Sequence, residues 1–244
     1  MNIEKKVHRR VGEAIRKHRM IEDGDRLLIA VSGGQDSCAL AHVLKEKQRI
    51  FPIQFDLGAC HIVTDVAPRE PEKEKNLDTF FSRLGIPLER HFVPVIDRLD
   101  EGRKMNCFFC AMQRRMKLLR VALENTCTKI AYGHHMDDII ETLFLNMLYK
   151  AEISTMPARL ELDEHDMVLV RPFCLTKKRE IKVYARRFGL TDLEQSCPYG
   201  EDGRRDRVRK IIDELAGEDD RIRDNLARSL GRVKIDYLQE KRRK

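Results

Sequence analysis

Val31-Ser32-Gly33-Gly34-Gln35-Asp36-Ser37 joins a short apolar run to an amphipathic segment. Residues 26–31, which precede the glycine pair, are almost continuously apolar, as in a parallel strand covered on both faces. After the pair, Leu40, Ala41 and Leu44 recur at helical spacing. The order strand, glycine turn, helix predicts a phosphate-binding loop, because backbone amides and a helix N-terminus there attract an anion. Glycine pairs also form ordinary turns, and no Gly-Lys-Ser or Gly-Lys-Thr follows to make a Walker loop.

The composition indicates a globular, mildly basic protein with one principal core. The chain has 244 residues, a formal net charge of +7 and a sequence pI near 9.0. Its apolar runs are too short to span a membrane, and its first residues lack an apolar leader, so we expect a cytoplasmic protein without membrane contact. The seven cysteines are an odd number, which argues against a disulfide framework and for metal ligation, reactive thiols or burial.

Apolar runs and amphipathic segments alternate along the chain, which predicts an α/β fold with a doubly wound, mostly parallel sheet. The expected strands are 26–31, 53–63, 90–95, 129–132 and 167–173, and the expected helices are 4–20, 37–48, 77–84, 111–125, 139–148, 177–188, 206–216 and 221–239. Residues 66–76 are expected to form an exposed connection, because they are rich in proline and charge. We expect a basic N-terminal helix (1–22), a nucleotide-binding domain (23–200) and a C-terminal helical tail (201–244).

A second polar cluster, Gly133-His134-His135-Met136-Asp137-Asp138-Ile139-Ile140-Glu141-Thr142, follows another expected strand. Its histidines and aspartates suit a metal site, whereas carboxylates at a helix start also serve as N-caps and dipole partners. Both interpretations remain open on the residues alone. His61 ends a neighbouring strand and is expected at the same edge of the sheet, because ligands gather at the carboxyl ends of parallel strands.

The cysteines fall into two groups. Cys107 and Cys110 form a C-x-x-C before a predicted helix, which suits half a zinc site, a redox pair or part of an iron–sulfur site. Cys197 lies in a polar turn where packing gives no reason for it, so it is the candidate third ligand. The others are expected to be buried small residues; they are Cys38, Cys60, Cys127 and Cys174.

These motifs together resemble a known family. The SGGQDS stretch resembles the SGGxDS signature of the PP-loop family, the N-type ATP pyrophosphatases. GHHMDDIIET is similar to the GHHxDDxxET element of its tRNA-modifying branch. With the C-x-x-C, the distant Cys197 and the MPARL and VLVRPF phrases, most of the chain resembles the tRNA 2-thiocytidine synthetase (TtcA) family.

The resemblance implies a function and assigns residues to it. It implies that ATP activates the C2 oxygen of a tRNA cytidine as an adenylate, and that sulfur carried on a 4Fe-4S cluster then replaces the oxygen. Asp36 and Asp138 would hold Mg2+, while Cys107, Cys110 and Cys197 would hold the cluster; Asp36 and these cysteines are the expected catalytic residues. The expected nucleotide-binding residues are Ala30, Ser32, Gly33, Gly34, Asp36, Ser37, His61, Gly133, His134 and Asp137. One departure is Gly200, where relatives often carry a second cysteine.

Two basic stretches are expected to bind the RNA. Residues 103–120 contain six Lys or Arg and no acid, and residues 171–189 contain seven Lys or Arg and one Glu, so each has a charge of +6. Such stretches neutralise phosphates, although solvated helix faces are the alternative. The expected partners are tRNA and a sulfur donor, either a cysteine desulfurase or sulfide, and a homodimer is left open. Two other functions remain: a lysidine-synthetase-like ligase, and a zinc-stapled nucleotide- or RNA-binding module without catalysis.

Overall fold

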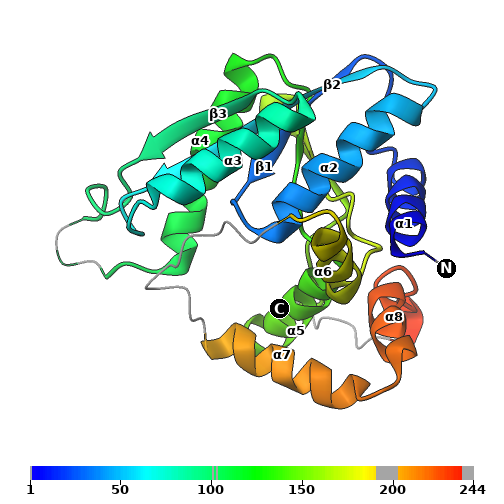
Figure 1. The fold of residues 1–244 in the computed structure, drawn as a ribbon. Coiled ribbons are helices and arrows are strands. Elements are labelled where there is room, and N and C mark those ends of the chain that lie inside the picture. The colour runs from blue at the N-terminus through cyan, green and yellow to red at the C-terminus, as the bar shows by residue number, and fades with distance from the viewer. Residues whose placement is uncertain (1, 101, 103, 191–202, 238–244) are drawn as a thin grey trace. The chain divides into compact units, whose positions relative to one another are not determined.

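The computed structural model describes residues 2–100, 102, 104–190 and 203–237. These residues form a sheet of six strands in the order β3-β2-β1-β4-β6-β5. Strands β3, β2 and β1 of this sheet are labelled in Figure 1. All neighbouring strands are parallel except β5 and β6, which are antiparallel. The expected α/β class with a doubly wound, mostly parallel sheet is therefore confirmed. The strands are β1 (Asp25–Val31), β2 (Phe55–Thr64), β3 (Leu88–Val93), β4 (Lys129–Ala131), β5 (Arg159–Leu162) and β6 (Met167–Val170).

Helices alternate with these strands along most of the chain. The α-helices are α1 (Ile3–Lys17), α2 (Gln35–Ile50), α3 (Pro71–Leu84), α4 (Cys107–Glu124), α5 (Met136–Lys150), α6 (Lys178–Arg187), α7 (Gly203–Ala216) and α8 (Asp220–Ser229), and the short 3-10 helices are η1 (Asp163–His165) and η2 (Ile235–Tyr237). No helix among the described residues is long and apolar enough to span a membrane.

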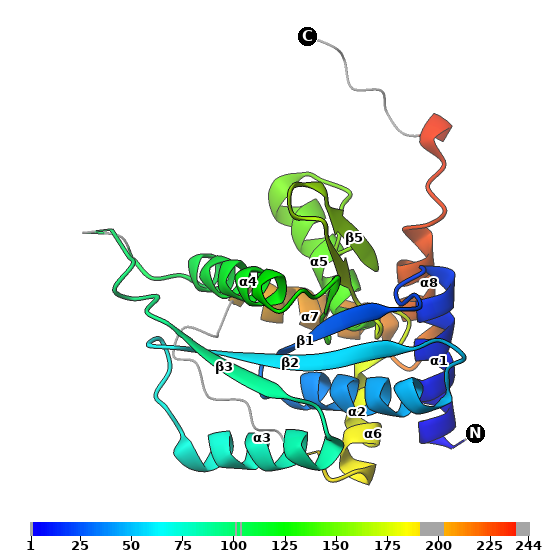
Figure 2. The same cartoon turned by 90° about the horizontal axis from the view of Figure 1, so that it is seen from above.

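The chain divides into two compact units, which are Met1–Met136 with Pro157–Asp202, and Asp137–Met156 with Gly203–Lys244. The first unit holds the whole sheet. Within it, α2 and α3 cover one face of the sheet and α4 covers the other (Figure 2). The strand order reverses between β1 and β4, because the chain leaves β3, crosses back along α4 and enters the sheet on the far side of β1. The carboxyl ends of β1 and β4 therefore meet at the switch point, where open α/β sheets bind ligands.

The core of the first unit lies between the sheet and its helices. Leu27 and Ile29 of β1 are fully buried, as expected for a strand covered on both faces. On the α4 side, Leu118 and Val121 pack with Val93 of β3 and other strand residues in one apolar cluster. This packing fixes where β1 ends and the glycine loop begins.

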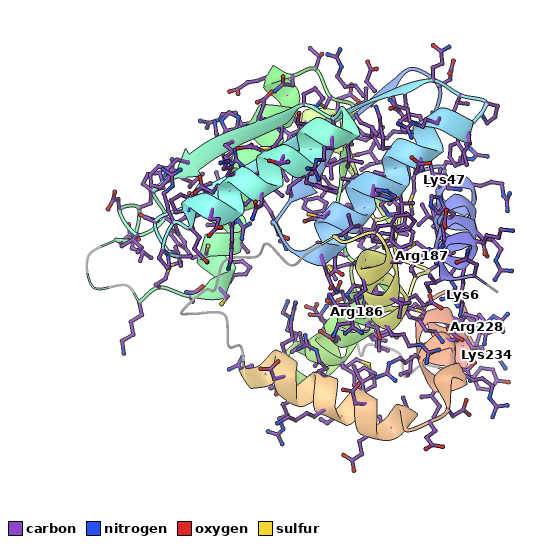
Figure 3. All side chains as sticks on the ribbon, in the orientation of Figure 1. Lys6, Lys47, Arg186, Arg187, Arg228 and Lys234 are labelled. Carbon is purple, nitrogen blue, oxygen red and sulfur yellow. The ribbon has the colours of Figure 1, made fainter. Side chains whose placement is uncertain are left out.

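The basic helix α1 is held to α6 by a buried carboxylate. Glu180 is 3% exposed, and its two oxygens lie 2.8 Å from Lys6 Nζ and 2.9 Å from Arg10 Nη1 (Lys6 is labelled in Figure 3). Arg10 also donates to the Leu175 carbonyl at 2.9 Å, and Val7 of α1 is fully buried. Two of the cations that gave α1 its basic character thus hold the helix in place.

Glu180→Gln is expected to lower the free energy of unfolding by about 2 to 4 kcal/mol, because it leaves two partly buried cations without their counter-charge. Glu4 of α1 offers a matched control, since it pairs with Arg187 of α6 at 3.7 Å and both side chains are largely exposed. Glu4→Gln should cost less than about 1 kcal/mol. Urea unfolding followed by circular dichroism measures both, and equal losses would show that burial of the Glu180 pairs contributes nothing.

The second unit consists of α5 and the C-terminal helices. Glu141 of α5 is 5% exposed, and its carboxylate accepts from Arg209 of α7 at 3.1 and 3.3 Å. One turn earlier, Asp137 accepts from Arg223 of α8 at 3.2 Å. Asp137 and Glu141 are four residues apart, so they lie on one face of α5 and bind both C-terminal helices. Helices α7 and α8 of the expected tail therefore belong to the same compact unit as α5. Helix α5 does not belong to the unit that holds the sheet.

Several expected boundaries are wrong. The second half of the expected connection 66–76 is the first turn of α3, which Pro71 begins because a helix leaves its first amides unbonded anyway. Helix α4 starts at Cys107 and not at residue 111, so the C-x-x-C lies inside the helix. Strand β5 was not expected, and α8 ends at Ser229, well before residue 239.

Candidate active site at the carboxyl ends of β1 and β4

The glycine loop between β1 and α2 is fixed by its own hydrogen bonds. Gly33 has a φ of 90°, which only glycine adopts readily. The Ser32 hydroxyl accepts from the Gly34 amide at 3.2 Å, and the Ser37 hydroxyl donates to the Gly34 carbonyl at 2.9 Å. Within the described residues no side chain caps α2, whose N-cap residue is Gly34. The first amides of α2 are therefore available to bind an anion.

The loop after β4 packs backbone to backbone against the start of α2. A Cβ atom at Gly133 would lie 3.2 Å from the carbonyl carbon of Asp36 and 3.3 Å from the amide nitrogen of Ser37. Those neighbours are backbone atoms that cannot move aside easily. Glycine at 133 therefore lets the backbone after β4 approach the start of α2 this closely, which places the first residues of the second motif beside the glycine loop.

Asp36 is the charged centre of this junction. One carboxylate oxygen, Oδ1, is buried and has no hydrogen-bond partner among the described residues. The other, Oδ2, forms an ion pair with Lys178 at the start of α6 and lies 3.9 Å from His135 Nε2. A buried carboxylate oxygen without a partner suits a cation that also binds phosphate, as the predicted Mg2+ would.

Lys178 and His135 were not among the expected site residues. Lys178 was counted only as part of the basic stretch 171–189, and His134 was preferred to His135. The position of Lys178 could have been found from the sequence, since it follows the strand that ends at Val170 and so belongs at the same edge of the sheet. The sequence could not show which histidine faces Asp36, because that depends on the local backbone conformation.

His61 and His134 lie beside the loops in supporting positions. His61 is 7% exposed, and its Nδ1–H donates to the Val31 carbonyl at 2.9 Å. Burial lowers the pKa of His61, so the ring is neutral at pH 7 and holds the end of β1. His134 stacks on the ring of Tyr132 at 5.4 Å between centroids. Ala30 of β1, which was also expected to bind the nucleotide, packs against the apolar cluster beneath α4.

The two expected aspartates of the second motif lie in the other compact unit. Asp137 and Asp138 form the first turn of α5. The Asp137 carboxylate pairs with Arg223, which also pairs with Asp213. Asp137 thus has a structural partner in α8, and its role toward a nucleotide and that of Asp138 toward Mg2+ stay predictions.

Cys107 and Cys110 are the accessible thiols of the described chain. Cys107 is the exposed first residue of α4 and Cys110 follows one turn later, half-buried. Asn106 caps the helix by accepting from the Phe109 amide at 2.9 Å. Since α4 leads from β3 toward β4, it begins at the carboxyl edge of the sheet, the edge that carries the glycine loop. Two thiols at the start of a helix fit a metal cluster that needs a further ligand.

The remaining described cysteines are buried, which confirms their expected structural role. Burial raises the pKa of the Cys60 and Cys174 thiols to about 12 and also raises that of Cys127. Cys38 is 1% exposed. Such thiols are poor metal ligands. The expected third ligand, Cys197, lies outside the described residues, and no group of three or more His, Cys, Asp or Glu side chains in the part that is described could hold a metal ion.

Comparison with known proteins identifies the class. Residues 3–215 match the family model of the PP-loop domain. The chain therefore belongs to the PP-loop family. Proteins named tRNA-cytidine(32) 2-sulfurtransferase are similar to this chain, in agreement with the resemblance of its motifs to the tRNA 2-thiocytidine synthetase family. The protein of that name from Anaeromyxobacter sp. (strain Fw109-5) is 36% identical over 244 residues, covering 98% of this chain and 79% of the relative. That from Aeromonas salmonicida (strain A449) is 39% identical over 187 residues, covering 75% of this chain and 61% of the relative.

A solved structure confirms the fold. The U34-tRNA thiolase NcsA from Methanococcus maripaludis, determined with its [4Fe-4S] cluster, superposes with a TM-score of 0.81 at 20% identity. The match covers 97% of this chain and 81% of the thiolase. At this identity the likeness establishes the α/β architecture of the PP-loop family.

Proposed function

We propose that the protein is an ATP-dependent tRNA thiolase that replaces the C2 oxygen of a cytidine by sulfur. The observation that carries the proposal is the placement of an exposed C-x-x-C, Cys107 and Cys110, at the sheet edge that bears the glycine loop. An adenylating site and a sulfur-handling site at one edge are what this reaction needs. The names of the relatives that match nearly the whole chain support the same substrate.

The reaction balances without net redox change. The C2 oxygen attacks the α-phosphate of ATP, which forms a carbon–oxygen–phosphorus link and releases pyrophosphate. A hydrosulfide-level sulfur then attacks C2, and the oxygen leaves with AMP. Activation is required because a pyrimidine carbonyl oxygen is a poor leaving group until it is adenylated.

The chain's own residues divide this work. The amides of Gly33 and of the first turn of α2 would bind phosphate oxygens, and Asp36 with Asp138 would hold Mg2+. Mg2+, when bound, would neutralise charge that develops on the leaving pyrophosphate. Cys107, Cys110 and Cys197 would hold the cluster, which would supply hydrosulfide-level sulfur for the attack on C2. Sulfide provides this sulfur directly, whereas persulfide sulfur from a cysteine desulfurase must first be reduced by two electrons from a thiol reductant.

Lys178 is assigned to the phosphates of ATP. Its ammonium group forms an ion pair with Asp36, and a bound cation would take over that charge and release Lys178 toward the triphosphate. Lys178→Ala is expected to slow pyrophosphate release by about a hundredfold, as removal of one preorganised donor does at other sites. A single-turnover assay with labelled ATP measures the rate.

Lys182 is the matched control, because it is an exposed lysine one turn further along α6. Lys182→Ala should keep the wild-type rate. A wild-type rate of pyrophosphate release in both variants would show that Lys178 does not act in the site. An equally reduced rate in both variants would assign the effect to the general positive charge of α6.

The metal content tests the cluster directly. Protein purified without oxygen is expected to be brown, with iron and sulfide in near-equal amounts. A colourless protein with stoichiometric zinc would instead support a zinc-stapled binding module and contradict the thiolase.

A further inference from the structure

The outward face of α4 is apolar where a solvated helix face is expected to be polar. The inner face is buried against the sheet through Leu118, Val121 and Ala122. The opposite face carries four large apolar side chains at helical spacing. They are Phe108, Met112, Met116 and Leu123, with 77%, 36%, 56% and 44% of their surface exposed. A continuous exposed stripe of this kind marks an interaction surface.

The charge around this stripe selects the partner. Residues 104–123 contain five Lys or Arg and no Asp or Glu. Arg115 and Arg120 are exposed and flank the stripe, and Lys104 is exposed just before the helix. A second copy of the same face would bring like charges together, which disfavours self-association through α4. A polyanion with apolar groups of its own fits both features.

The position of Phe108 narrows the partner to RNA. Phe108 follows Cys107 in the first turn of α4, at the carboxyl edge of the sheet. Unpaired bases in RNA loops stack on exposed aromatic side chains while Arg and Lys bind the phosphates. From Phe108 to Leu123 the stripe is about 22 Å long, at the usual rise of an α-helix.

We propose that the outward face of α4 binds a single-stranded loop of the substrate tRNA, with Phe108 stacked on an unpaired base and with Arg115 and Arg120 on the backbone. This inference rests on the proposed function, which requires a tRNA base near Cys107. It adds the surface and the side chain that bring the base there.

The stacking contact is tested by binding of unmodified tRNA transcript to the anaerobic holoprotein, measured by fluorescence anisotropy. Phe108→Ala is expected to weaken binding about tenfold. Phe108→Tyr should bind like the wild type, because tyrosine keeps the ring face. Phe92 of β3 is the matched control, since it is 58% exposed and its neighbour Val93 packs in the α4 cluster, which puts Phe92 on the opposite face of the sheet; Phe92→Ala should have no effect.

The backbone contacts are tested by the salt dependence of the same binding. The double variant Arg115→Gln/Arg120→Gln should reduce the slope of log affinity against log salt by about 1 to 2, because each lost phosphate contact removes close to one unit. Arg83, an exposed arginine of α3 on the other face of the sheet, serves as the control. Arg83→Gln should leave the slope unchanged.

Three results would overturn the inference: wild-type affinity in Phe108→Ala, an equal loss in Phe92→Ala, or a Phe108 variant that loses cluster absorbance or changes its oligomeric state while still binding tRNA. Failure of the proposed function looks different. A wild-type protein that binds tRNA through Phe108 but forms no thiolated nucleoside would support the α4 surface and contradict the thiolase.

Discussion

Asp36→Asn is expected to lower the rate of pyrophosphate release by at least about a hundredfold, with cognate tRNA and saturating ATP and Mg2+. The carboxylate lies at the first turn of α2, with Oδ1 buried and lacking a hydrogen-bond partner among the described residues. Asparagine keeps the shape but removes the charge that would hold the cation against the phosphates. It also replaces the carboxylate of the Asp36–Lys178 ion pair by a neutral amide.

Two variants make this result specific. Asp56 of β2 carries a 73% exposed carboxylate whose partner Arg26 lies 3.7 Å away, so Asp56→Asn should keep the wild-type rate. In Asp36→Asn the further change Lys178→Ala should cost much less than it does alone, because the two side chains act on the same phosphates. A rate within twofold of wild type for Asp36→Asn would refute its role in cation binding.

Cys107→Ala is expected to abolish both cluster absorbance and thiolation, and Cys110→Ala and Cys197→Ala should do the same. With only two thiolates left, the cluster has too few protein ligands, and sulfur has no site from which to attack. Nucleotide binding should survive, because the glycine loop is built from other residues. Ultraviolet–visible absorption, iron analysis and nucleoside mass spectrometry give the three readouts.

Cys127→Ala is the control for loss of a thiol as such, since Cys127 is buried and burial raises its pKa. It should keep the chromophore at some cost in stability. Thiolation that persists in Cys197→Ala would show that another group is the third ligand.

The parts of the fold that the sequence predicted are those encoded by short-range patterns. The apolar run before Ser32 predicted β1, because a strand covered on both faces needs apolar residues throughout. The glycine pair predicted the loop after it, because a positive φ favours glycine. Gly133 was predicted for the nucleotide site as part of a motif, and its close approach to Asp36 explains the choice of glycine. The short edge strand β5 was missed, since its alternation of polar and apolar residues extends over only four positions.

The parts that the sequence did not predict depend on partners far along the chain. Asp137 resembles a ligand residue, yet its carboxylate pairs with Arg223, 86 residues later. Glu180 is buried by Lys6 and Arg10 of α1, which the sequence described only as a basic helix. Lys178 meets Asp36 across 142 residues, and only its place after an expected strand could have indicated that pairing. No pattern of neighbouring residues reveals an ion pair between such distant positions. From the sequence, the members of these pairs are therefore expected to be exposed charges.

Formation of the product on tRNA tests the central claim most directly. Anaerobically purified protein with its cluster is incubated with unmodified tRNA, ATP, Mg2+ and sulfide, and the tRNA is then digested and its nucleosides are measured by mass spectrometry. We expect 2-thiocytidine to form only when ATP is present, with one pyrophosphate released for each cytidine converted. Thiolation of a uridine, attachment of an amino acid, or unchanged cytidine despite an intact cluster would contradict it.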